Sequence, residues 1–230
     1  MGTSKGYIAP TKPEWSNAKR AVSAYLRNRD SESKGNAVQK FAEAMNTSGG
    51  TVSQSFSSAA GGILGFARGV NQNGLDNTLS AFGRDDLIGK DPEYILSELL
   101  NQFTNNSATI DDSMAADALS QAFDNLGIET IDDLGTVDLD SLLREMVTEF
   151  ININFDLRFE EKIGHDRAST EKFAILDEMH KYIADIIHDV LTEHEIKKID
   201  LANLNASTIV MDTLKGAFNV CARFYGEAIK

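Results

Sequence analysis

The feature that most constrains the fold is the spacing of apolar residues in the last third of the chain. Two stretches there repeat apolar side chains every three or four positions, which keeps them on one face of an α-helix. The first stripe is Phe173, Leu176, His180, Ile183, Ile187 and Val190, and the second is Met211, Leu214, Phe218, Cys221 and Tyr225. We therefore predict two long C-terminal helices, with a bend between Asp200 and Ser207.

The segment from Phe150 to Glu160 fits two structures. After its first pair it alternates apolar and polar residues, which is typical of a strand. The same region also keeps helical spacing along two lines: Leu143, Met146, Phe150, Ile153 and Leu157 form one, and Ile151, Phe155 and Phe159 form the other. Because no convincing partner strand occurs elsewhere, we favour a helix buried on two sides, with a strand as the alternative.

The remaining helix signals predict an all-α fold, an irregular multi-helix bundle. Asp91 and Pro92 are typical of a helix start, and Gly127 of a helix end. Helices are expected near residues 14–28, 35–45, 57–70, from 92 onward and 112–126. We expect an extended N-terminal arm over 1–13 and a single helical domain over 14–230, with a glycine-rich middle at 49–89.

Three glycines in that middle recur every four residues, at Gly61, Gly65 and Gly69. This spacing gives a helix a flat side against which another helix can pack closely. It also occurs in membrane helices that dimerise, but Arg68 and the short apolar run favour packing in a water-soluble protein. The stretch lacks the spacing of a phosphate-binding loop.

Composition excludes several classes of protein. Hydrophobic residues make up 42% of the 230 residues and charged ones 25%, the balance of a globular protein. The single cysteine, Cys221, excludes an intramolecular disulfide and suits a reducing compartment. No apolar stretch reaches the ~20 residues of a membrane span, and no signal segment opens the chain. We expect a cytoplasmic protein.

Charge is distributed unevenly along the sequence. The net charge is −13, yet residues 1–40 carry eight basic against three acidic side chains. The acidic remainder would repel phosphates, so direct nucleic-acid binding is not expected. The basic residues Lys19, Arg20, Arg27 and Arg29 either meet an acidic partner or pair with the protein's own acidic face, and the sequence leaves both open.

Candidate catalytic groups have simpler explanations. Asp177 and His180, like Asp185 and His188, repeat the carboxylate-x-x-His element of di-iron bundles. The two histidines, however, lie about 12 Å apart along one helix, too far to share a metal. We expect no metal, no cofactor and no catalytic residue, and a helical metalloenzyme is the least favoured alternative.

Two other features also favour structural roles. Cys221 belongs to an apolar stripe without a basic neighbour, which favours a buried small residue. The acidic run over 132–140 lacks the ligand spacing of a calcium loop, so we assign it to helix caps and turns.

The arm carries the remaining candidate chemistry. Gly2 is small enough that removal of Met1 is expected, leaving a free amine with a reference pKa near 8. Part of that amine is neutral at cellular pH and can attack an activated carbonyl. Myristoylation is less favoured, because position 6 is Gly rather than Ser or Thr. Trp15 could stack on a base, but it more simply anchors the first helix in the core.

The opening Met1-Gly2-Thr3-Ser4, followed by Tyr7, Ala9-Pro10, Trp15 and Lys19, resembles the QatB family of the bacterial Qat anti-phage defence system. The resemblance implies a non-catalytic protein that works beside an ATPase, a QueC-like enzyme and a TatD-like nuclease. QueC-like enzymes activate a carboxylated deazaguanine with ATP and normally pass it to ammonia.

The resemblance gives the arm an expected role. Gly2 is the expected acceptor of a deazaguanine conjugate, because its amine can replace ammonia. The residues expected to be recognised by the partner are Thr3, Ser4, Tyr7, Pro10 and Trp15. The alternative is a noncovalent helical adaptor that links the ATPase to its partners.

Overall fold

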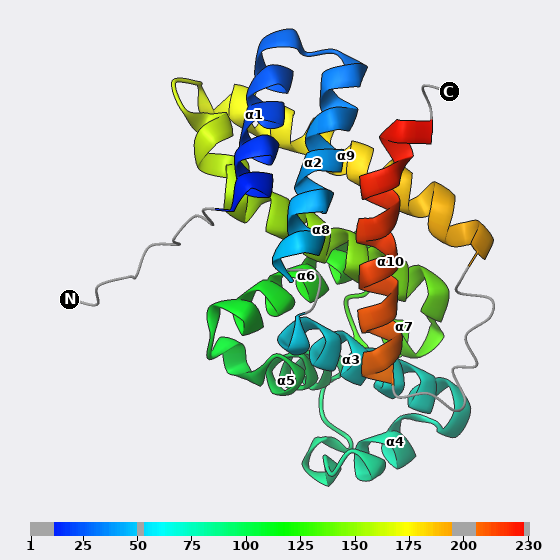
Figure 1. Cartoon of the computed structure of the whole chain (residues 1–230). Helices are drawn as coiled ribbons and strands as arrows, with labels where there is room; N and C mark the ends of the chain where they lie inside the picture. The colour runs from blue at the N-terminus through cyan, green and yellow to red at the C-terminus, as the bar shows by residue number, and fades with distance from the viewer. Residues whose placement is uncertain (1–11, 50–52, 195–205, 228–230) are drawn as a thin grey trace.

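The computed structural model describes residues 12–49, 53–194 and 206–227, and within these ranges the chain forms ten α-helices, two short 3₁₀ helices and no strand (Figure 1). The elements are α1 (Pro13–Asn28), α2 (Ser31–Ser48), α3 (Gln54–Asn73), α4 (Leu75–Ala81), η1 (Asp85–Leu87), α5 (Pro92–Phe103), η2 (Asn105–Ser107), α6 (Ile110–Leu126), α7 (Ile131–Thr136), α8 (Leu139–Gly164), α9 (Ser169–His194) and α10 (Ala206–Glu227). The predicted all-α fold is confirmed.

Local capping explains where several helices begin and end. The Asp91 carboxylate accepts hydrogen bonds from the amides of Glu93 and Tyr94, and Pro92 occupies the first helical position, as predicted. Gly127 ends α6 in the left-handed conformation, at φ 66°. Helix α2 begins earlier than expected, because the Asp30 carboxylate accepts from the Ser33 amide and caps the helix.

Helix α8 confirms the helical interpretation of residues 150–160. It runs unbroken for 26 residues and packs against α6 on one side and α9 on another, with further contacts to α3 and α10. Phe150 and Ile151 are buried on adjacent positions, so the apolar–polar alternation reflects a helix enclosed by neighbours on more than one side. Leu157, expected on a buried line, is 37% exposed.

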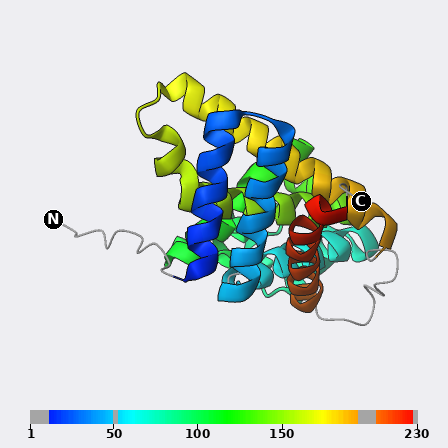
Figure 2. The same ribbon diagram turned by 45° about the horizontal axis from the view of Figure 1, so that its top comes forward.

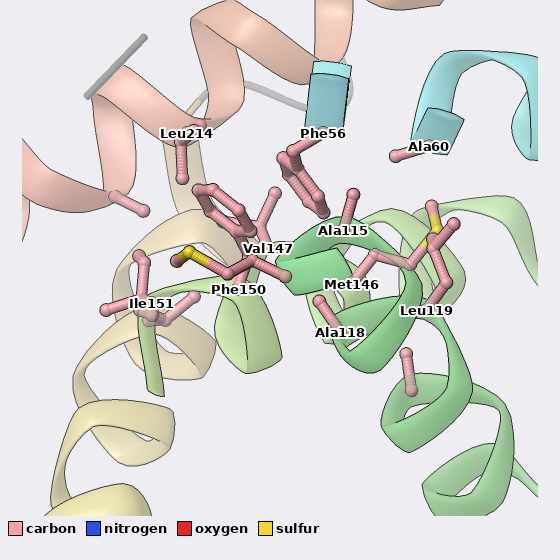
Figure 3. Packing of buried hydrophobic residues seen from close by; sticks show 14 of the residues in the cluster. Phe56, Ala60, Ala115, Ala118, Leu119, Met146, Val147, Phe150, Ile151 and Leu214 are labelled. Carbon is pink, nitrogen blue, oxygen red and sulfur yellow. The ribbon is translucent and has the colours of Figure 1, made fainter. Parts of the chain in front are cut away.

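The core joins helices that are distant in sequence. Phe56 of α3 stacks on Phe150 of α8 with ring centroids 4.1 Å apart, and Leu214 of α10 and Ala115 of α6 lie around them (Figure 3). In both ribbon views α1 and α2 form an adjacent pair, and α10 packs against α2 and α3 (Figures 1 and 2). The last helix therefore closes a core begun by the first three.

Two of the predicted small-residue positions, Gly61 and Gly69, mark a close approach of two helices. A Cβ atom at Gly69 would lie 2.7 Å from Cγ2 of Thr78 in α4. A Cβ atom at Gly61 would lie 2.6 Å from the backbone nitrogen of Ser207, at the start of α10. A Cβ at Gly65 would meet nothing closer than Phe82, at 3.9 Å. Helix packing thus depends on Gly61, whereas Gly65 has room for a side chain.

The predicted stripe of α9 is partly wrong. Phe173 is 61% exposed, and the buried face is instead formed by Ile175, Leu176, Met179, Ile183, Ile186 and Ile187. The face is rotated because α8 and α10 both cover this helix. The side chains of Val190 and Tyr225, and the expected bend over 200–205, lie outside the described residues.

Candidate functional site

The arm meets the helical body at Lys12 and Pro13. Lys12 has an extended backbone, its ammonium donates to the Thr47 carbonyl at 3.4 Å, and Pro13 opens α1. Proline suits this place because the first helical amide has no acceptor within the helix. The predicted acceptor and four of the predicted recognition residues lie outside the described residues, namely Gly2, Thr3, Ser4, Tyr7 and Pro10.

Trp15 lies in the first turn of α1 and is 1% exposed. Its ring lies 6.4 Å from that of Phe41 and 6.5 Å from that of Phe159, measured between centroids. The guanidinium carbon of Arg158 lies 4.9 Å from the Trp15 ring centroid, a cation–π contact. The ring therefore anchors α1 to α2 and α8.

This burial changes the role expected for Trp15. A side chain enclosed by aromatic rings and a guanidinium offers no surface to a partner, so direct recognition through Trp15 does not fit the structure. The structure instead fits the interpretation that Trp15 anchors the first helix in the core. Trp15 fixes the direction of α1 close to the point where the preceding residues join it.

The basic residues of α1 and of its C-cap, Arg29, differ in which of the two alternatives left open by the sequence they fit. The Arg29 guanidinium lies 2.8 Å from the Glu178 carboxylate on α9, and Lys34 lies 2.9 Å from the other oxygen. The Lys34 hydrogen bond, with smaller contributions from Tyr25 and Arg29, lowers the pKa of Glu178. Lys19 and Arg27, in contrast, line an open groove beside α8.

The histidines of the metal hypothesis lie against different carboxylates. His180 Nε2 is 2.7 Å from Asp156 Oδ1, and His188 Nε2 is 3.5 Å from Glu145 Oε2. Each contact joins α9 to α8. In the described ranges, no group of three or more His, Cys, Asp or Glu side chains is placed to hold a metal.

Sequence reasoning missed a buried carboxylate near these pairs. Glu149 of α8 is 8% exposed and accepts hydrogen bonds from Asn125 and Asn152. Burial is the largest cause of its raised pKa, and the neighbouring Glu145 adds to the shift. The sequence offered one signal for this residue, namely its place among the buried positions of α8. A charged residue at such a position needs polar partners.

Cys221 and the acidic run have the structural roles predicted from the sequence. Cys221 is 2% exposed, and burial raises the pKa of its thiol to about 12. In the acidic run, the Asp133 carboxylate accepts from the Thr130 amide, and the Asp138 carboxylate accepts from the Ser141 amide. These bonds cap α7 and α8. Hydrogen bonds from the Thr130 and Ser141 hydroxyls, followed by those from the two amides, lower the pKa of both carboxyl groups.

The fold defines a class of all-helical protein over the described residues, and its ion pairs at Glu178, His180 and His188 join segments that are distant in sequence. A family model described as "Qat anti-phage system associated protein QatB" matches residues 46–221, more than three quarters of the chain. The chain therefore belongs to the QatB family and is a component of an anti-phage defence system. No curated protein and no solved structure matches it.

The match to the family model and the resemblance of the N-terminal motif rest on different parts of the chain. The matched range begins at residue 46, in α2, and does not include the N-terminal motif. The family assignment is confirmed by the helical body, whereas the role of the arm needs its own test. None of the helices in the described ranges is both long and apolar enough to cross a membrane.

Proposed function

We propose that the chain is a non-catalytic, cytoplasmic component of the Qat system whose Gly2 amine, freed by removal of Met1, accepts a deazaguanine from a QueC-like enzyme. The ATPase and the TatD-like nuclease of the same system are the other proposed partners. Family membership supports the defence role. The observation that carries the acceptor role is the Met1-Gly2 pair at the start of the arm.

The proposed reaction is an amide-forming acyl transfer. ATP first converts the deazaguanine carboxylate into an acyl adenylate, with release of pyrophosphate. The neutral Gly2 amine then attacks the carbonyl carbon, forming a C–N bond while the C–O bond to AMP breaks. The amine loses one proton to solvent or to a base of the enzyme. An α-amine suits this role better than a lysine, because its lower pKa leaves more of it neutral.

The anchored start of α1 supports the proposed division into an arm over 1–13 and a single helical domain over 14–230. A partner that draws the arm into its active site pulls on α1. The Trp15 ring, held by Phe41 and Phe159, resists that pull. Recognition of the arm itself is proposed to rest on Thr3, Ser4, Tyr7 and Pro10.

Intact-mass spectrometry of the chain, expressed with and without the QueC-like partner, tests the proposal. We expect one added deazaguanine acyl group, which peptide fragmentation locates on residue 2. Gly2→Leu should retain Met1 and lose the modification at residue 2, because a large side chain blocks methionine removal. Gly2→Ala is the matched control, since it permits that removal. An unchanged mass beside an active partner would refute the acceptor role.

A noncovalent adaptor is the second candidate, and it is favoured by Lys19 and Arg27 of α1, which line an open groove. Deleting residues 2–12 separates the two functions. An adaptor should still co-purify with its partners and protect cells from phage. An acceptor should lose both modification and defence.

A further inference from the structure

A groove of about 920 Å³ lies between α1 and the C-terminal end of α8, and extends under the turn into α9. Both ribbon views show α1 beside this end of α8 (Figures 1 and 2). The basic side chains that line the groove are Lys19, Arg27, Arg158, Lys162 and Arg167. They come from segments more than 130 residues apart, so the fold alone brings them together.

Three of these cations form no ion pair with the residues that the structure describes. No ion pair joins Lys19, Arg27 or Lys162 to a carboxylate in the described part of the chain. Arg167 is partly neutralised, because its guanidinium lies 3.2 Å from Glu171. On a protein of net charge −13, neighbouring free cations form a local site of attraction for an anionic ligand.

Apolar and acidic residues also line the groove. Leu157 is 37% exposed, and Leu26 is half-buried beside it in the lining. Glu161, Asp166 and Glu171 lie among the basic residues. A continuous phosphate backbone would approach these carboxylates and be repelled. A peptide can instead place carboxylates at the free cations and an apolar side chain at the leucines.

We propose that this groove binds an acidic peptide segment of a partner protein, with its carboxylates at Lys19, Arg27 and Lys162 and an apolar side chain against Leu26 and Leu157. Arg158 contributes to the lining while its guanidinium stays on Trp15, 4.9 Å from the ring centroid. The inference does not depend on conjugation at Gly2, because the lining residues that carry it all lie at or after Lys19.

Fluorescence anisotropy with the full chain tests the proposal. The probe is a short labelled peptide in which glutamate alternates with leucine, and the matched probe has glutamine in place of glutamate. We expect only the acidic peptide to bind, with affinity that falls as salt rises. Lys19→Glu and Lys162→Glu should each weaken binding at least about tenfold, since each replaces attraction by repulsion.

Controls keep the outcomes distinct. Lys90→Glu makes the same charge change outside the groove and should leave the affinity unaltered, and circular dichroism checks that each variant is folded. Deleting residues 2–12 should not change peptide binding, whatever happens to modification at Gly2. Three outcomes would overturn the proposal. The acidic peptide could fail to bind, or Lys90→Glu could lose as much peptide affinity as the groove variants. An oligothymidylate could also bind the groove more tightly than the peptide does.

Discussion

Replacing Gly61 by alanine tests the close contact between α3 and α10. The new Cβ atom would lie 2.6 Å from the Ser207 nitrogen and 2.7 Å from its Cα. Both are backbone atoms, so the clash cannot be relieved by turning a flexible side chain. The two helices must move apart, and the neighbouring core must follow.

The expected magnitude follows from two opposing effects. Forcing an extra carbon into a packed contact costs about 1–3 kcal/mol. Alanine in place of a helical glycine returns up to about 1 kcal/mol. Gly61→Ala should therefore lose up to about 2.5 kcal/mol of unfolding free energy, which lowers the Tm by roughly 2–4 °C for each kcal/mol. Gly65→Ala should gain about 0.5–1 kcal/mol, because its Cβ would meet only Phe82, at 3.9 Å.

The two variants form a matched pair on one helix. Urea denaturation followed by circular dichroism gives both unfolding free energies, and their difference cancels the gain in helix propensity. That difference should be about 1–3 kcal/mol, with Gly65→Ala the more stable variant. If Gly61→Ala matched or exceeded Gly65→Ala in stability, the proposed close packing of α10 on α3 would be wrong.

Three further predictions concern buried side chains. Trp15→Ala should cost about 3–5 kcal/mol of unfolding free energy in urea melts, whereas Trp15→Phe should cost less, and equal losses would contradict anchoring by the ring. Because the pKa of Glu149 is raised above its ordinary 4.5, the folded state holds the proton longer, and stability should fall as pH rises through that window. Glu149→Gln should thus have a higher unfolding free energy than the parent at pH 7, and this advantage should vanish below pH 4. A difference in unfolding free energy that stayed constant with pH would refute this. Finally, Cys221 should react with Ellman's reagent at pH 8 only after unfolding, since a pKa of about 12 leaves roughly one thiolate in ten thousand, and fast native labelling would contradict its burial.

The sequence was informative where local chemistry decides the structure. Asp91 with Pro92 and Gly127 bounded their helices as predicted, because capping involves only neighbouring residues. The helix over 150–160 could be predicted because two apolar lines coexist there. Phe173 was misassigned, because the face that a helix buries depends on which helices cover it, and sequence spacing does not specify the neighbours.

The candidate site was only partly predictable. The basic residues of the first helix were visible, but the sequence left two uses for them open. The structure shows Arg29 paired with Glu178, while Lys19 and Arg27 line the groove. Lys162 was not expected there, because the approach of α8 to α1 is a tertiary contact that no local pattern encodes.

The packing of α10 on the early helices has a consequence for the order of events during synthesis. Phe218 lies 5.9 Å from Phe41, between ring centroids, so the aromatic cluster is complete only when the last helix has been made. At about 5–20 residues per second, translation needs roughly 10–40 s to reach that helix after the amino terminus has been made. The amino terminus is therefore made well before α10, and a partner that binds the finished helical body must wait for the ribosome to release α10.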